Sequence, residues 1–249
     1  MRKLSLVILS IMLAASLPAC GRTGRTDSQT EGNSVARTPA AQKDGTTNNT
    51  EENNQAESSQ TGNSNILIAY FTVPEDVEAS GNDAVAGASI VVKDNERMGN
   101  TEYVAGIVQK TTGGDLFKIE TKDAYPLEHD TLVDQAADEQ DKNLRPELSG
   151  HIEDIGKYDT IILGYPNWWA DLPMPVYSFL EEYDFSGKTI ITFVTHGGSG
   201  FSSTISTISE LQPDADISSN TLSLPRQDVA DGEEETREWA ESLGLGTSS

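Results

Sequence analysis

The sequence has one cysteine among its 249 residues, Cys20. A single cysteine excludes an intramolecular disulfide, a Cys-x-x-Cys redox pair and a cluster of thiolate metal ligands. Any redox chemistry in this chain must therefore use a bound cofactor. Histidine is also scarce, since the three histidines stand far apart and none lies in a His-Glu-x-x-His arrangement. We therefore expect no built-in metal site.

A membrane-spanning apolar run is missing as well. The uncharged run at residues 4–17 is shorter than the roughly 20 residues that a spanning helix needs. Two bases precede it and Leu17-Pro18-Ala19-Cys20 ends it, which predicts a secretory signal peptide over residues 1–19. The Leu-x-Ala-Cys run resembles the bacterial lipobox, whose cysteine is diacylated and becomes the first mature residue. Two acyl chains suffice for stable anchoring. We expect an exported protein that is held by Cys20 to the extracellular face of the cytoplasmic membrane, the alternative being an ordinary signal peptide with an incidental cysteine.

Large hydrophobic side chains are almost absent from residues 20–65. This segment has no aromatic residue, and Val35 is its only branched aliphatic. Such a composition buries too little surface to fold. We predict a disordered linker that tethers a folded domain, residues 66–249, to the lipid; a glycosylated or wall-binding stalk is the alternative.

Positive charge is the last scarce feature. Residues 1–65 contain six bases and six acids, so the whole formal net charge of −23 belongs to the domain. A field of that sign repels nucleic acid and anionic lipid heads and favours cationic or neutral partners. Nucleic acid is excluded as a partner, and we expect membrane contact by the lipid anchor only. The same acidity also suits a soluble surface with no steering role.

Apolar runs alternate with helical patterns from residue 66 onward. Strands are predicted at 66–71, 116–119, 160–164 and 189–195, with a weaker one within 217–224. Helices are predicted to follow them, at about 103–112, 128–142, 174–183, 202–211 and 233–243. This alternation predicts an α/β fold with a five-stranded parallel doubly wound sheet. In such sheets the ligand lies beyond the carboxyl ends of the strands, so three loops become candidates.

The first candidate loop has two halves. Thr72 ends the first strand, and Gly99-Asn100-Thr101 precedes the first helix. A helix N-terminus with hydroxyl and amide donors binds phosphate without Lys or Arg. The insertion at 73–98 separates the halves and contains a rival, Ser80-Gly81-Asn82-Asp83. We favour the run at residues 99–101, although Gly-Asn-Thr before a helix also suits a plain N-cap.

The second candidate loop, Gly164-Tyr165-Pro166-Asn167-Trp168-Trp169, ends the third strand with two adjacent indoles. Consecutive loop residues point in different directions, so at least one indole is expected to be exposed or to cover a ligand. Packing under the nearby prolines is the structural alternative. The sequence does not distinguish which tryptophan stacks.

The third candidate loop is Thr195-His196-Gly197-Gly198-Ser199-Gly200-Phe201, after the fourth strand. Three glycines in four residues permit close approach of the backbone to a ligand. His196 is a candidate ligand contact by its position, or else it caps a helix or faces solvent.

The three loops follow strands one, three and four, and with them the stretch from Ile66 to about Leu243 resembles the flavodoxins. It is similar to flavodoxin-like proteins of anaerobic and other Gram-positive bacteria, including lipoproteins that carry the same Gly-Tyr-Pro-Asn-Trp-Trp and Thr-His-Gly-Gly-Ser-Gly runs. The resemblance implies noncovalent FMN, with its phosphate at the first loop, a tryptophan against the flavin ring, and the third loop on the far side of the ring. Two features depart from the family pattern: the insertion, and a missing tyrosine that leaves one flavin face to His196, Phe201 or a substrate.

The resemblance leaves three functions open. The first is an FMN-binding electron-transfer protein that docks on a redox partner protein or a membrane redox complex and needs no catalytic acid or base. The second is an FMN-dependent oxidoreductase that accepts hydride from NAD(P)H and reduces quinones or other small molecules. The third is a flavin-free ligand-binding lipoprotein, because a fold alone does not determine function.

Two acidic pairs, Asp138/Glu139 and Glu181/Glu182, lie on predicted helices. We interpret both as solvated helix faces. Arg145 is unusual in so acidic a chain, and the sequence assigns it no role.

Overall fold

The computed structural model describes residues 65–76, 89–93 and 96–246. The predicted signal peptide, Cys20 and the tether up to residue 64 lie outside the described residues, as does the rival loop at residues 80–83. Within these ranges, none of the helices combines the length and the apolarity that crossing a bilayer requires.

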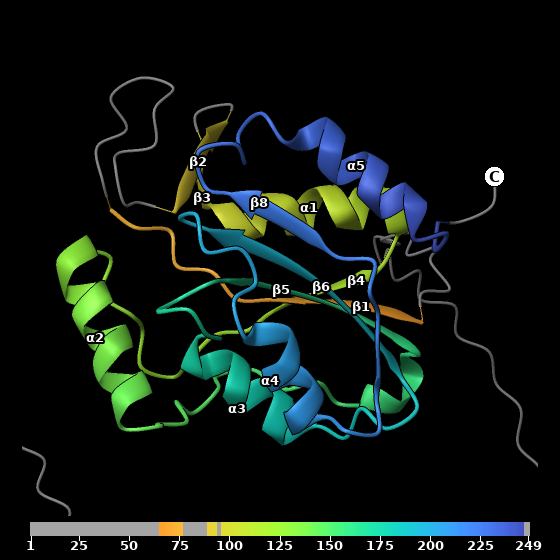
Figure 1. Cartoon of the computed structure of the whole chain (residues 1–249), viewed down its shortest axis with the longest axis horizontal. Helices are drawn as coiled ribbons and strands as arrows, with labels where there is room; N and C mark the ends of the chain where they lie inside the picture. The colour runs from red at the N-terminus through yellow and green to blue at the C-terminus, as the bar shows by residue number, and fades with distance from the viewer. Residues whose placement is uncertain (1–64, 77–88, 94–95, 247–249) are drawn as a thin grey trace, which may run out of the picture. The chain divides into compact units, whose positions relative to one another are not determined.

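A parallel sheet forms the centre of the domain, as the strand and helix alternation predicted (Figure 1). Its strands are β1 (Ile66–Tyr70), β4 (Asp115–Lys118), β5 (Thr160–Pro166), β6 (Thr189–His196), β7 (Asp216–Ile217) and β8 (Leu222–Pro225). Their order is β4-β1-β5-β6, and both β7 and β8 pair in parallel with β6. The weak fifth strand is therefore present in two pieces, because β7 pairs with the start of β6 and β8 with its end.

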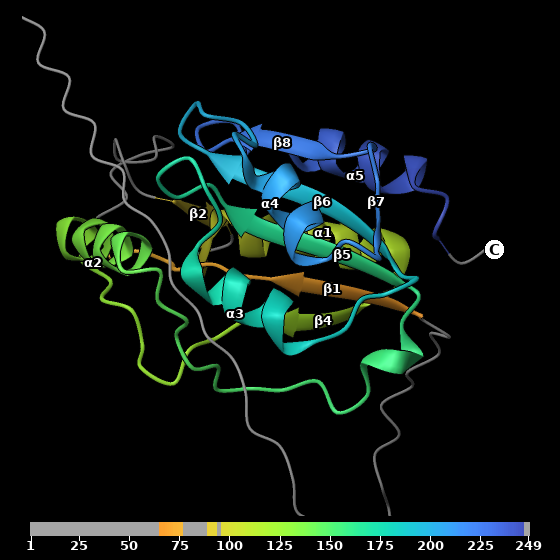
Figure 2. The same cartoon turned by 60° about the horizontal axis from the view of Figure 1, so that its bottom comes forward.

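Two helices cover each face of the sheet (Figures 1 and 2). The α-helices of the described residues are α1 (Asn100–Thr112), α2 (His129–Asp141), α3 (Met174–Glu182), α4 (Thr204–Leu211) and α5 (Glu233–Ser242). Helices α1 and α5 lie on one face, and α3 and α4 lie on the other. Alternate β1 side chains enter the two separate cores, since Ile66 and Ile68 pack with α1 while Leu67 and Ala69 face the other side. This is the doubly wound arrangement.

The remaining helix, α2, lies at the edge where the strands end. In Figure 2 the arrowheads of β1 and β5 point toward it. A helix between two parallel strands normally packs on a face of the sheet. Here one flank of α2 closes the carboxyl end of the sheet instead, which places the side chains of this helix beside the predicted loops.

The insertion before α1 contributes an antiparallel hairpin of β2 (Ile90–Lys93) and β3 (Glu96–Gly99). The sequence patterns did not predict this hairpin. Its second strand runs directly into α1, and the backbone N–H of Asn100 donates to the Ser89 carbonyl at 3.0 Å. The hairpin therefore fixes the direction from which the chain enters the helix.

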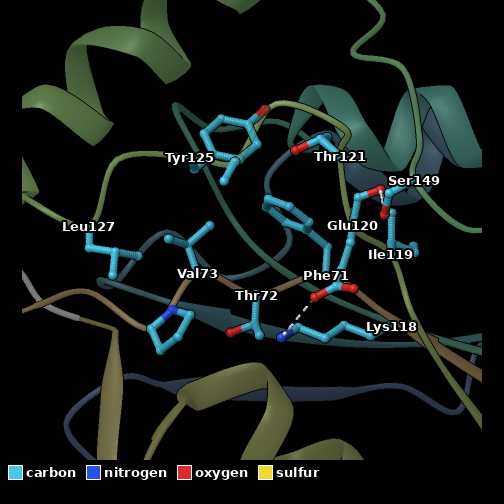
Figure 3. Close-up of a pocket in the computed structure, with 12 residues that line it drawn as sticks. Phe71, Thr72, Val73, Lys118, Ile119, Glu120, Thr121, Tyr125, Leu127 and Ser149 are labelled. Atoms are coloured by element: carbon cyan, nitrogen blue, oxygen red, sulfur yellow. Dashed lines mark hydrogen bonds and ion pairs between the residues drawn. The ribbon is translucent and has the colours of Figure 1, made fainter.

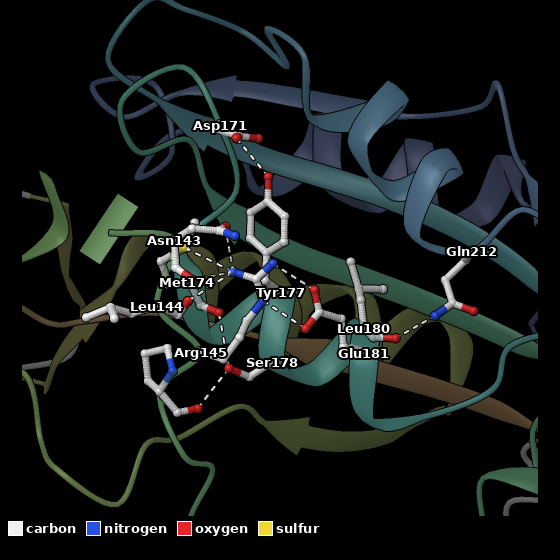
Figure 4. Close-up of polar contacts among 11 residues, drawn as sticks. Asn143, Leu144, Arg145, Asp171, Met174, Tyr177, Ser178, Leu180, Glu181 and Gln212 are labelled. Carbon is white, nitrogen blue, oxygen red and sulfur yellow. Dashed lines mark hydrogen bonds and ion pairs between the residues drawn. The ribbon is translucent and has the colours of Figure 1, made fainter. Parts of the chain in front are cut away.

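Arg145 ties the segment after α2 to α3 (Figure 4). Its guanidinium donates two hydrogen bonds to Glu181, at 2.8 and 2.7 Å, and lies 4.6 Å from the centre of the Tyr177 ring. The solvated interpretation of the acidic pairs is wrong for Glu139, which is buried and accepts hydrogen bonds from Tyr125 and Gln135. These contacts give Arg145 and Glu139 structural roles that hold the α2 region in place.

Candidate functional site

The two halves of the first loop meet in space despite the insertion between them. A Cβ atom added to Gly99 would lie 1.9 Å from Thr72 Oγ1 and 3.0 Å from Thr72 Cβ. The two ends of the insertion, at Thr72 and Gly99, therefore lie next to each other. Thr72 and the start of α1 form one wall at the carboxyl end of β1.

The next two residues are buried, and hydrogen bonds join them to β6 and to the residue after β8. Thr101 shares a hydrogen bond of 2.9 Å with the Thr195 hydroxyl, and the Asn100 amide donates to the Arg226 carbonyl at 3.5 Å. Asn100 Oδ1 is buried without a hydrogen-bond partner. A helix N-terminus presents backbone N–H groups and positive potential, so this wall suits an anion such as phosphate.

The two adjacent tryptophans differ in environment. The Trp168 ring packs edge-on against Phe71 and Tyr125, with ring centres 5.2 and 5.7 Å apart. Trp169 is 57% exposed, and its indole N–H points across to the Val133 carbonyl of α2 at 3.4 Å. Trp168 is therefore packed within an aromatic cluster, and Trp169 is the more exposed of the two indoles.

The local backbone explains why Trp169 is exposed. Trp168 and Asp171 exchange backbone hydrogen bonds of 3.1 and 3.0 Å, so the two residues between them form the tip of a tight turn. Both tip residues are left-handed, with φ of +52° for Trp169 and +64° for Ala170. Such a turn normally has Asn-Gly at these positions. The fold thus holds a large aromatic in an unfavourable conformation at the rim of a site, where strain of this kind is concentrated.

The second and third loops are joined to each other. Pro166 and Thr195 are register partners at the ends of β5 and β6, and Asn167 donates through its side chain to the Gly200 carbonyl at 2.7 Å. Gly198 and Gly200 have φ of +123° and +58°, a conformation that favours glycine. The Ser199 carbonyl accepts from Ser202, which closes the turn.

His196 uses both ring nitrogens within the protein. Its Nδ1 accepts from the Gly198 backbone N–H at 2.9 Å, which leaves Nε2 to donate to the Ser223 hydroxyl at 3.0 Å. Burial lowers the pKa of His196, and the charge of Asp228 opposes this shift. A neutral imidazole that bridges its own loop and β8 shapes the site. Phe201 packs partly against the core below the loop, and its contact with a flavin stays a prediction.

A pocket lies where these loops face α2. Its lining includes seven of the predicted residues: Pro166, Asn167, Trp168, Trp169, Thr195, His196 and Gly197. The other lining residues are Glu75, Ser89, His129, Leu132, Val133, Ala136 and Arg226. Its volume is about 170 Å³, below the roughly 300 Å³ at which ligand pockets usually begin. Trp169 and Val133, which a hydrogen bond of 3.4 Å joins, both line this pocket.

A second cavity, of about 310 Å³, lies beside the first (Figure 3). Phe71 and Tyr125 line it, and both touch Trp168, which lines the first pocket. Thr72 also borders this cavity, and Lys118 forms an ion pair with Glu120 on its polar side. The two cavities are thus separated by an aromatic partition.

A family model for flavodoxin matches residues 89–243, which is more than half of the chain. The chain belongs to the flavodoxin family. No curated protein matches it.

Two solved structures share this fold with TM-scores above 0.5. A candidate flavoprotein from Bacteroides eggerthii is 25% identical, with a TM-score of 0.53, over 72% of this chain and 97% of its own. A second, from Bacteroides uniformis, is 24% identical, with a TM-score of 0.54, over 72% of this chain and 98% of its own. A flavoprotein from Lactobacillus acidophilus in complex with FMN is 16% identical, with a TM-score of 0.46, over 68% of this chain and 97% of its own.

The polar groups of this flavodoxin site suit a flavin nucleotide. Asn100 Oδ1 and Asn167 Oδ1 are buried acceptors without partners, and such atoms normally find a donor. The ribityl hydroxyls and the ring N–H of a flavin are donors of the required kind. Glycine at position 99 lets Thr72 approach the start of α1 closely. The N-terminus of α1 then suits the phosphate.

Sequence reasoning missed four polar residues of the pocket: Glu75, Ser89, His129 and Arg226. Arg226 is the first residue after β8, and its backbone N–H donates to the His196 carbonyl at 2.8 Å. The rule that ligands lie beyond the carboxyl ends of strands pointed to this position. Glu75 and His129 are 54 residues apart, and no sequence spacing joins them.

Proposed function

We propose that this domain binds FMN noncovalently at the carboxyl end of the sheet and transfers electrons. The observation that carries the proposal is Trp169, which is exposed on a strained turn at the rim of a pocket. The wall formed by Thr72 and residues 99–101, which we call the cradle, lies at the same end of the sheet. FMN supplies the redox chemistry, which no cysteine of the domain offers.

The residues of the chain divide the work of binding. The α1 N-terminus, with Thr72 and Thr101, holds the phosphate, and the two unpartnered asparagine oxygens accept hydrogen bonds from the ribityl chain and the ring. Trp169 stacks on the ring, where offset stacking contributes about 1 kcal/mol beyond burial. The glycines at 197, 198 and 200 let the third loop approach the other side of the ring.

An FMN titration tests this proposal. Purified protein should be yellow, and stripped protein should take up one FMN per chain in calorimetry with quenching of the flavin fluorescence. Protein that stays colourless and gives no heat with FMN would leave the ligand-binding lipoprotein as the better interpretation.

We also propose that the mature chain is tethered by a lipid on Cys20 to the extracellular face of the cytoplasmic membrane. The support is the sequence of residues 2–20 and the composition of residues 20–65. Cells fed a labelled fatty acid should incorporate label into the wild-type chain and not into Cys20→Ala. Equal labelling of both would contradict the anchor.

The pocket gives one reason to consider a reductase beside a carrier. A carrier needs no acid or base, yet a histidine paired with a buried carboxylate lines the pocket. Rapid anaerobic bleaching of the bound flavin by NADH alone would support a reductase. Bleaching only with a partner reductase would support a carrier.

A further inference from the structure

Glu75 is a buried carboxylate beside the flavin pocket. It is 3% exposed, and its Oε1 accepts a hydrogen bond of 2.9 Å from the Ser89 backbone N–H. Its Oε2 lies 2.5 Å from Nδ1 of His129, the first residue of α2. A buried carboxylate is costly unless it is paired in this way.

His129 is the more exposed residue of this pair. Its side chain is 36% exposed, and its ring lines the same pocket as Trp169 and Arg226. Because Nδ1 faces Glu75, Nε2 is the ring nitrogen left for a ligand. A carboxylate that accepts from Nδ1–H fixes the orientation of the imidazole, so that Nε2–H faces the pocket as a general acid would.

The rest of the pocket indicates what would receive the proton. Leu132, Val133 and Ala136 of α2 form an apolar wall next to His129, and Trp169 adds an aromatic surface. The positively charged Arg226 also lines the pocket. Apolar walls with a proton donor and a cation suit a flat, neutral acceptor that gains negative charge on its oxygens during reduction.

We propose that His129, oriented by Glu75, is the proton donor to a quinone-type acceptor in this pocket. The proposal rests on the proposed FMN binding. A quinone becomes a hydroquinone by taking up two electrons and two protons. Hydride from the reduced cofactor brings both electrons and one proton, and His129 Nε2–H delivers the second proton to a quinone oxygen. Solvent then reprotonates the imidazole, and a reduced nicotinamide or a partner protein reduces the cofactor again.

The pair also has a structural aspect that the experiment must separate. Through its two carboxylate oxygens, Glu75 joins Ser89 to His129 of α2. The neighbouring Asp76 backbone N–H donates to the Leu127 carbonyl, just before α2, at 2.7 Å. Loss of either side chain therefore affects the seating of α2. A variant that keeps the shape but not the proton is needed.

The experiment compares two oxidants on the pre-reduced FMN protein. 2-Methyl-1,4-naphthoquinone takes up protons with its electrons, whereas ferricyanide takes up one electron and no proton. In anaerobic stopped flow, His129→Gln should reoxidise with the quinone about 100-fold more slowly than wild type, the lower end of general-acid effects. Its rate with ferricyanide should stay within about twofold of wild type, since ferricyanide accepts no proton and needs no proton donor.

His151→Gln is the matched control. His151 forms a similar pair with Glu182, at 2.6 Å, but that pair is exposed and does not line the pocket. This variant should match wild type with both oxidants. Glu75→Gln, which keeps the shape of the carboxylate, should slow only the quinone reaction.

Three readouts besides the rates complete the test: FMN affinity by fluorescence titration, binding of the quinone to the oxidised protein, and the unfolding temperature. All three should be the same in His129→Gln as in wild type. Equal quinone rates in both proteins would overturn the proposal, and so would equal slowing with both oxidants, which indicates a structural role. Wild-type protein that takes up no FMN would overturn it through the proposed function, and the titration identifies that case.

Discussion

The two ends of the candidate site are built in opposite ways. At the cradle end, Asn100 and Thr101 are fully buried and a methyl group on Gly99 would collide with Thr72. At the ring end, Trp169 is exposed on a turn of two left-handed residues, neither of them glycine. One end is close-packed before any ligand binds, and the other holds a large aromatic at the surface against its conformational preference.

This difference indicates a division of labour. The residues of the buried cradle lose their conformational entropy when the protein folds, so ligand binding does not have to order them again and their contacts add directly to affinity. A left-handed conformation costs roughly 1–2 kcal/mol for each non-glycine residue, and a fold retains such strain where surrounding contacts or a ligand use it. We infer that the cradle sets how tightly FMN is held, while the rim sets what reaches the flavin ring.

The sharpest way to break this comparison is a methyl group in the cradle. Gly99→Ala should weaken FMN binding at least 100-fold, about 2.7 kcal/mol. The new Cβ would meet Oγ1, Cβ and Cγ2 of Thr72 at 1.9, 3.0 and 3.2 Å. The contact with Thr72 Cβ persists in every rotamer of that side chain, so the backbone of this wall must shift. Calorimetric titration of FMN into the stripped variant measures the loss.

Gly106→Ala is the control, because Gly106 lies in the same helix and an added Cβ has no neighbour within 4 Å. It should leave the affinity unchanged and raise the free energy of unfolding by about 1 kcal/mol. Normal FMN binding by Gly99→Ala would show that the phosphate does not lie at this wall.

The tryptophans offer a reciprocal test. Trp168→Ala should lower the free energy of unfolding by about 3 kcal/mol, because it removes the ring that touches Phe71 and Tyr125. Trp169→Ala should scarcely change unfolding but weaken FMN binding about tenfold, the upper range for one stacking contact. Urea unfolding of the stripped proteins and FMN titration of both variants give the four values.

Trp239→Phe controls for the loss of an indole, since Trp239 packs against Phe193 in the core on the α1 side of the sheet. If Trp169→Ala bound FMN as tightly as wild type, the strained turn would have another purpose and the rim would not face the flavin.

The positions of β1, β5 and β6 along the chain were predictable because these strands are buried on both faces and read as largely apolar runs. Gly113 caps α1 with a φ of +74°, the left-handed conformation that glycine commonly adopts after a helix. The position of α2 was not predictable, because an amphipathic pattern shows that a helix buries one side without showing against what. Burial of Glu139 followed from that placement, so the solvated interpretation failed with it.

The candidate site divides along the same line. The three loops were found from local signals alone, because runs of Gly, Asn, Thr and Trp directly after a strand are typical of a ligand-binding loop and not of packing in the core. The choice between Trp168 and Trp169 depended on a two-residue turn whose tip lacks Asn and Gly. Glu75 and His129 meet because Glu75 follows β1 at the sheet edge where α2 lies. Long-range closure of this kind leaves no trace in residue spacing.

A smaller effect tests the strain at the rim directly. Ala170→Gly should raise the free energy of unfolding by about 1 kcal/mol, because glycine adopts φ of +64° without the Cβ penalty. The same change in a helix, Ala137→Gly in α2, should have the opposite sign and a similar size. Urea unfolding of the stripped proteins compares them, and destabilisation by Ala170→Gly would mean that the turn carries no strain.

The smallest expected effect concerns His196, which belongs to the rim by position but to the packed interior by its contacts. Burial holds its pKa below the ordinary 6.5, so between that value and the lower folded pKa the unfolded chain binds a proton that the folded protein does not. Stability should therefore fall as the pH drops below 6.5, and it should not change through this group at higher pH. His196→Gln removes the titration, so its unfolding free energy should decline less than that of wild type between pH 7.5 and pH 5.5. If urea unfolding showed the same decline of the unfolding free energy with pH in wild type and variant, the imidazole would be exposed to solvent. The third loop would then belong, like Trp169, to the exposed end of the site.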